Sequence, residues 1–153
     1  MRGLPDESHR LRPDHLPTPF SAAQIRAASR PGREVRSLVV RAGADPVVRA
    51  IRFLAGDADG GDGESWMETP DGARLSEPER SRSDWLELQK HASMPADRTR
   101  IEEETFEIPA GRFDGWRYTR TDEDGLSLFW FARSQPGMPL RYEQRVGDEV
   151  VFS

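Results

Sequence analysis

The sequence contains no cysteine, so disulfide bonds and thiol catalysis are excluded. Lysine is almost absent too: Lys90 is the only one among 22 basic residues, a bias that we attribute to a GC-rich coding sequence. No stretch approaches the roughly 18 apolar residues of a membrane span. The N-terminal segment MRGLPDESHRLRPDH lacks the apolar core of a signal peptide. We therefore expect no membrane span and a cytoplasmic location, or an exported protein if a signal was trimmed from the chain.

Motifs of the common catalytic classes are also missing, since the chain has no G-x-S-x-G, no P-loop and no G-x-G-x-x-G. His9 and His15 lie near each other without a third ligand, which argues against a metal site. His91 ends an expected helix, where packing or a favourable contact with the helix dipole is the commoner role, although it is the only histidine in an expected ordered segment. The sequence predicts neither metal nor cofactor.

The formal net charge of −5 argues against nucleic-acid binding, because a surface that neutralises phosphates needs clustered Lys and Arg. Arginine is abundant here, but it alternates with acidic residues. The partners that remain are an apolar small molecule and another protein.

The length of 153 residues suits one domain with one core. Residues 1–19 hold four prolines among charges, which predicts an extended or disordered arm. Residues 20–153 are expected to form a single antiparallel β domain. A capping box of Ser21 and Gln24, with Phe20 and Ile25 as a hydrophobic staple, predicts a helix that ends near Arg30.

The middle of the chain predicts short strands and a second helix. Strands over 35–42 and 47–54 read as a hairpin. Two more short strands, 66–69 and 73–75, flank the turn Pro70-Asp71-Gly72. A helix is expected from Trp85 to Ala92, capped by Ser83 or Asp84.

The C-terminal third gives the fold class. Segments 101–108, 115–121, 126–132 and 139–146 follow one another with turn residues between them and aromatic residues at period two. Segment 126–132 is apolar on both faces, so it should be central and covered on both sides. We expect a mostly β (α+β) protein: a strongly twisted antiparallel sheet or half-barrel of about eight strands with two short helices.

The turn at residues 122–125 sets the register of these strands. A three-residue loop places Trp130 opposite Tyr118 and, through the next hairpin, Tyr142 opposite Trp130. One face would then hold Trp116, Tyr118, Leu126, Leu128, Trp130, Leu140, Tyr142 and Val146. A two-residue Asp124-Gly125 turn would instead place Phe129 and Phe131 beside Trp116 and Tyr118. We favour the first register because it makes both hairpins agree.

The loop GDADGGDGE resembles a calcium-binding loop in its carboxylates, with Asp57 first and Glu68 twelfth. Position five is Gly61 and position six is Asp62, so the ligand and the glycine bend are both misplaced. A solvated glycine-rich hairpin loop is the favoured interpretation.

The candidate ligand-binding residues are Glu104, Trp116, Tyr118, Arg120, Trp130 and Tyr142. The Trp and Tyr side chains carry polar tips that a pocket can offer to a ligand, although such sets are more often core. Glu104 near Arg120 suits a ligand anchor or an acid–base pair, although a cross-strand ion pair is commoner.

The run Asp114-Gly115-Trp116-Arg117-Tyr118-Thr119-Arg120, followed by a turn, a strand and Pro139-Leu140-Arg141, is similar to the closing strands of the violacein-pathway enzyme that has the half-barrel fold of bacterial lipoprotein carriers. The expected order of helices and strands resembles that family as a whole. The resemblance covers about 30 residues and implies a concave sheet that holds an apolar or aromatic ligand without metal or nucleotide. It transfers no catalytic residue.

Three functions follow as hypotheses. The first is a non-catalytic module that binds an apolar or aromatic small molecule on the concave aromatic face. The second is a cofactor-independent enzyme in the same pocket, with Glu104, Arg120 and His91 as its polar groups. The third is a protein-interaction domain whose sheet face is filled.

Overall fold

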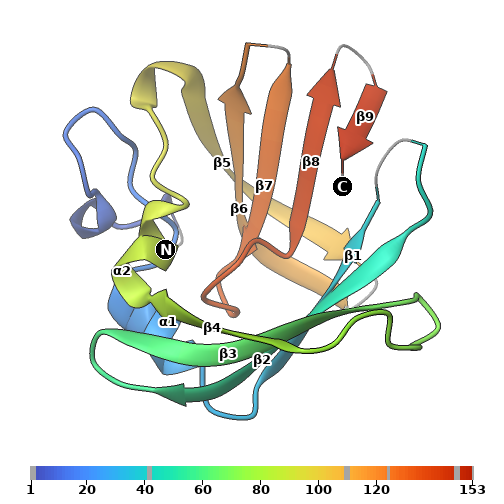
Figure 1. The fold of residues 1–153 in the computed structure, drawn as a ribbon. Helices are drawn as coiled ribbons and strands as arrows, with labels where there is room; N and C mark the ends of the chain where they lie inside the picture. The colour runs from blue at the N-terminus through green and yellow to red at the C-terminus, as the bar shows by residue number, and fades with distance from the viewer. Residues whose placement is uncertain (1–2, 41–42, 109–110, 124, 147–148, 153) are drawn as a thin grey trace.

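The computed structural model describes residues 3–40, 43–108, 111–123, 125–146 and 149–152. Its described residues form two antiparallel sheets with strand orders β1-β2-β3-β4 and β5-β6-β7-β8-β9, and two short α-helices (Figure 1). The helices are α1 (Ala22–Ala28) and α2 (Trp85–Lys90). The strands are β1 (Glu34–Val39), β2 (Val47–Gly56), β3 (Gly60–Glu68), β4 (Glu79–Asp84), β5 (Thr99–Ile108), β6 (Gly111–Thr121), β7 (Leu126–Ala132), β8 (Arg141–Val146) and β9 (Glu149–Phe152).

The predicted fold class is confirmed: the protein is mostly β with two short helices, and its sheets are open. The β1–β2 hairpin lies where the sequence placed it. β3 runs through the glycine-rich segment that we expected to be a loop, and it pairs with β4, which the charged run Glu79–Asp84 did not suggest. Residues 73–75 form only an isolated bridge, between Arg74 and Glu68.

Both helices begin as the sequence predicts. The Ser21 hydroxyl accepts a hydrogen bond from the Gln24 amide at 3.2 Å, and the Gln24 side chain accepts one from the Ser21 amide at 2.9 Å, which completes the capping box. Asp84 caps α2 by accepting from the amides of Leu86 and Glu87. Figure 1 shows α1 and α2 beside each other at one end of the molecule.

The predicted register of the C-terminal strands is wrong by one residue. Trp116 pairs with Phe131 and Tyr118 with Phe129, because the β6–β7 loop spans residues 122–125 and the last pair before it is Thr121 with Leu126. The next hairpin shifts likewise, so that Tyr142 pairs with Phe129. A slip of one residue inverts every side chain, and Trp130 therefore lies on the face opposite Trp116, Tyr118 and Tyr142.

We name the two faces of the five-stranded sheet by what lies on them. The helix-covered face carries Trp116, Tyr118, Phe129, Phe131 and Tyr142, and Phe20, Ile25, Trp85 and Met94 complete the buried core on that side. The charged face carries Glu102, Glu104, Arg117, Trp130, Arg141 and Glu143, with a second core of Phe106, Leu128, Trp130 and Ala132. β7 is the central strand and is buried on both sides, as its composition predicted.

Trp85 joins the helices to the four-stranded sheet. Its indole nitrogen donates to the Asp57 carbonyl oxygen at 2.8 Å, at the turn between β2 and β3. A Cβ added at Gly61 would lie 2.6 Å from the Trp85 ring, so only glycine allows the strand to come this close. Gly61, which occupies a ligand position of the calcium-loop pattern, thus makes room for a tryptophan.

The N-terminal segment, for which we expected an extended or disordered arm over residues 1–19, contains a short 3-10 helix, Glu7–His9, and packs on the domain where the structure describes it. The Leu16 amide donates to the Met94 carbonyl at 2.9 Å, and the Ala96 amide donates to the Asp14 carbonyl at 2.9 Å. Thr18 is fully buried and its hydroxyl donates to the Phe20 carbonyl at 2.8 Å. This segment therefore covers part of the helix-covered face.

Candidate functional site

Trp116 and Tyr118, at the centre of the predicted pocket, are buried and shielded from solvent. Tyr118 is 0% exposed, and its hydroxyl donates to the Pro17 carbonyl at 2.7 Å. Burial raises the pKa of this phenol. The Trp116 indole donates to the Gly3 carbonyl at 2.9 Å. The polar tips that we expected to meet a ligand are instead bound to the N-terminal segment.

Tyr142 and Arg120 share the helix-covered face but do not close a pocket with the buried pair. The Tyr142 ring is half-buried and packs on Phe129, with ring centroids 5.0 Å apart. Arg120 donates to Asp122 at 2.8 Å and lies over the Phe129 ring at 5.5 Å. Burial acts to raise the pKa of the Asp122 carboxyl, but its bonds to Ser127 and Arg120 outweigh burial and lower it.

Glu104 and Trp130 lie together on the charged face. The Trp130 indole donates to one Glu104 oxygen at 2.5 Å, and Arg117 donates to the other at 3.0 Å. The Arg141 guanidinium lies 4.7 Å from the centre of the Trp130 ring. The commoner alternative for Glu104, a cross-strand ion pair, is confirmed, but its partner is Arg117 and not Arg120.

The polar groups of the hypothetical enzyme are therefore not brought together. Glu104 lies on one face of the sheet and Arg120 on the other, since Arg120 shares the parity of Tyr118 along β6. His91 is exposed at the end of α2. Within the described part of the chain, no three His, Asp or Glu side chains converge on a point that a metal ion could occupy.

Arginines bind three carboxylates of the calcium-like segment, those of Asp57, Asp62 and Glu64. Arg82 donates to both Asp57 oxygens at 2.8 Å, and the amides of Asp59 and Gly60 donate to the same carboxylate. These bonds, that of Arg82 foremost, lower the pKa of Asp57 to about 2. Glu64 pairs with Arg52 at 3.0 Å.

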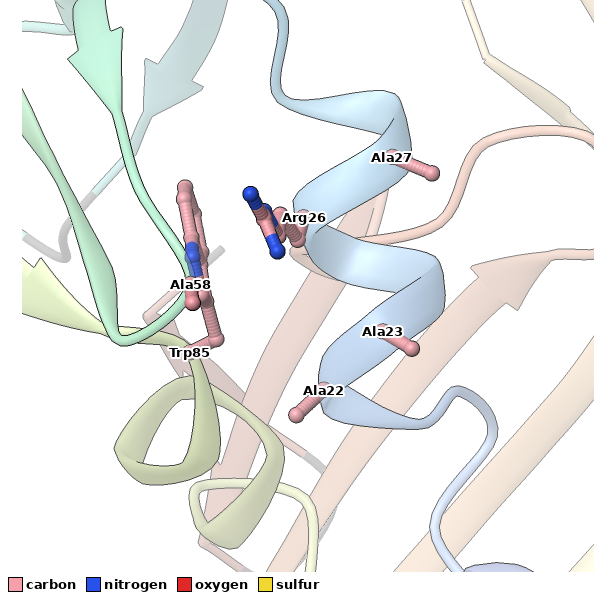
Figure 2. A pocket seen from close by; sticks show the side chains of 6 residues that line it. All are labelled: Ala22, Ala23, Arg26, Ala27, Ala58 and Trp85. Atoms are coloured by element: carbon pink, nitrogen blue, oxygen red, sulfur yellow. The ribbon is translucent and has the colours of Figure 1, made fainter.

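A surface hollow of about 430 Å³ lies between α1, the β2–β3 turn and α2. We call it the alanine hollow, because Ala22, Ala23, Ala27 and Ala58 line it together with Arg26 and Trp85. Figure 2 shows the Trp85 ring and Ala58 on one side, α1 on the other, and the Arg26 side chain extending from α1 into the space between them.

Trp85 forms a fixed wall of the hollow, since it is buried and its indole nitrogen is held by the Asp57 carbonyl. The packing of α1 on α2 holds the opposite wall, and the Ala22 amide donates to the Gln89 side chain at 2.9 Å. Arg26 is exposed and forms no ion pair within the residues that the structure describes. The hollow thus offers one free cation between apolar walls.

None of the six predicted site residues lines the alanine hollow. Two partial signals are visible in the sequence: Ala22, Ala23 and Ala27 form one small-residue surface on a capped helix, and Trp85 begins the second helix. Neither signal says that the two segments meet, because more than 55 residues separate them along the chain.

Comparisons with protein-family models, with curated proteins and with solved structures found no match. The resemblance to lipoprotein carriers therefore stays a prediction. Among the described residues, no helix has the length and apolar character needed to cross a membrane.

Proposed function

We propose that this chain is a non-catalytic binding module that holds an apolar or aromatic small molecule in the alanine hollow. The observation that carries the proposal is the apolar lining of this hollow on two fixed walls. The hollow measures about 430 Å³ and is open to the surface on the side away from its walls.

The site differs from the one expected on the sheet. Phe20, Ile25 and Met94 pack on the aromatic face there, and the N-terminal segment binds the polar tips of Trp116 and Tyr118. The alanine hollow lies at a different place, between α1 and the Trp85 side chain. Both sites contain a tryptophan ring against which an apolar ligand would pack: Trp116 and Trp130 in the predicted site, and Trp85 in the alanine hollow.

A neutral fluorescent probe tests this proposal. N-phenyl-1-naphthylamine should bind the folded protein saturably, and Ala27→Phe should abolish binding because the new ring fills the hollow from an exposed helix position. Ala96→Phe is the matched control, since Ala96 is exposed and lies outside the hollow. Binding that survives Ala27→Phe as well as Ala96→Phe would contradict the proposal.

The filled aromatic face favours a second candidate, a protein-interaction domain. The aromatic residues of this face are buried in the protein's own core, so they leave no room there for a small molecule. A partner would then bind the outer surface of the domain. Sedimentation velocity over a range of concentrations tests the simplest partner, a second copy. Self-association that Ala27→Phe disrupts, together with absence of probe binding, would favour this candidate over the first.

A further inference from the structure

We infer that the molecule held in the alanine hollow is an organic monoanion, a carboxylate with an aromatic or aliphatic body, bound through Arg26. This inference rests on the proposed function and adds the charge and chemical class of the ligand. Arg26 is the one charged residue of the lining, and its guanidinium extends into the space between α1 and Trp85.

Arg26 has neither an acid nor a side-chain hydrogen-bond acceptor among the described residues. Two other arginines are engaged: Arg82 in β4 holds Asp57, and Arg33, which also lacks an acid, donates to the Ala28 carbonyl and to Gln135. No carboxylate among the described residues pairs with Arg26. Its five N–H donors are therefore available to a ligand.

The acids nearest to the hollow along the chain flank Ala58. Asp57 accepts from Arg82 and from two backbone amides, so its oxygens are already satisfied and remain ionised above about pH 2. Asp59 is exposed and adjoins Ala58 of the lining, and its carboxylate forms no ion pair among the described residues. Removing that charge should strengthen binding of an anion.

The shape of the site selects among anions. A planar guanidinium matches a carboxylate with two parallel hydrogen bonds. One cation balances a monoanion, whereas a phosphate monoester carries roughly −1.5 to −2 at neutral pH. Alanine methyls and the Trp85 ring offer contact to an apolar body and nothing to an inorganic ion. In a carboxylate with an apolar body, the carboxylate binds Arg26 while the body packs against the alanines and Trp85.

Two probes of equal shape separate charge from apolar contact. Titration calorimetry at low salt should show that 2-naphthoate binds at least about tenfold more tightly than 2-naphthalenemethanol, since a charge-assisted bond to arginine is added. Arg26→Gln should remove this preference and leave binding of the neutral alcohol unchanged. Arg26 is exposed, so the variant should fold, which circular dichroism verifies.

Two further variants locate the effect. Arg30→Gln removes an exposed cation just beyond α1 and outside the lining, and should retain the preference for naphthoate. Asp59→Asn should increase affinity for naphthoate and not for the alcohol.

The outcomes separate the two proposals. If both probes bind equally and Ala27→Phe blocks both, the ligand is not selected for its negative charge, but the proposal of a binding module holds. A preference for naphthoate that persists in Arg26→Gln would also overturn the assignment to Arg26. Failure of both probes to bind would remove the binding module and the anion together.

Discussion

Arginine side chains cover the rings of buried tryptophans on both sheets: Trp66 on the first, and Trp116 and Trp130 on the second. Trp66 is 3% exposed and donates to Glu68 at 2.9 Å, with Arg52 and Arg74 within 5.0 Å of its ring centre. Trp130, on the other sheet, has the same arrangement with Glu104 and Arg141. The guanidinium plane stacks on the ring while its charge stays solvated, so an arginine-rich surface can bury aromatic residues.

The buried carboxylate Glu143 makes stability depend on pH. Burial acts to raise the pKa of Glu143, but hydrogen bonds and charges from Arg145 and Arg141 outweigh it, so the folded pKa lies below the ordinary value of 4.5. Its contribution to stability is therefore complete above about pH 4.5 and is lost as pH falls through the folded pKa.

Glu143→Gln should accordingly flatten the acid side of the stability curve. Urea unfolding at pH 7 should show a lower free energy of unfolding for the variant than for the wild type, and the difference should shrink as pH falls from about 4.5 through the folded pKa of Glu143. Glu77→Gln, at an exposed position, is the control and should leave the curve unchanged. A constant difference between Glu143→Gln and wild type from pH 7 to pH 3 would contradict the pKa assignment.

The Ser21 hydroxyl is the residue-level feature that the sequence predicted best, since capping depends on neighbours along the chain. Ser21→Ala should lower the free energy of unfolding by about 1 kcal/mol, because the Gln24 amide loses its acceptor. The denaturation midpoint measures the loss. Ser134→Ala, at an exposed loop position, should have no effect, and an equal effect of both substitutions would exclude a specific role for the cap.

At the scale of elements, the sequence predicted which strands exist better than how they align. The strand 126–132 is apolar on both faces, so either register buries aromatic residues and hydrophobicity cannot choose between them. The deciding feature was the turn: Asp122 and Gly125 are joined by backbone hydrogen bonds and Thr121 pairs with Leu126, whereas the three-residue loop that we favoured pairs Asp122 with Leu126 and places Trp130 on the wrong face. β4 was missed because five of its six residues are exposed and its charged sequence has no apolar alternation.

Gly115 tests the register of β6 on β7. A Cβ at this position would lie 1.8 Å from the Phe131 carbonyl oxygen, so Gly115→Ala forces the two strands apart. We expect a loss of about 1–3 kcal/mol or more, as for overpacked sites, measured by chemical denaturation. Gly3→Ala is the control, because a Cβ there meets no atom within 4 Å. Unchanged stability of Gly115→Ala would contradict the pairing described here.

At the scale of the whole molecule, the aromatic face is open or filled according to what covers the sheet, which no local sequence pattern predicts. The helices and the N-terminal segment fill the aromatic face with Phe20, Ile25 and Met94, which lie far from β6 and β7 in sequence. The alanine hollow arises where α1 meets the β2–β3 turn and Trp85, and no local pattern encodes that meeting. Local signals therefore gave the caps and hairpins, while the site depends on long-range packing.

The N-terminal segment supplies hydrogen-bond acceptors to buried aromatic side chains, and deleting its first residues tests how much stability it contributes. The Gly3 carbonyl accepts from the Trp116 indole at 2.9 Å and from Arg133 at 2.9 Å. A variant lacking residues 1–8 leaves the buried indole without an acceptor, which should cost about 1–3 kcal/mol of stability.

Hydrogen exchange of the tryptophan indole protons, followed by NMR, measures this directly. The Trp116 signal, assigned with Trp116→Phe, should exchange faster in the truncated variant. The indole protons of Trp66 and Trp130 are internal controls, because their acceptors are the glutamates Glu68 and Glu104 within the sheets. Equal protection of Trp116 with and without residues 1–8 would show that the Gly3 carbonyl does not hold this indole and that the segment only lies on the surface.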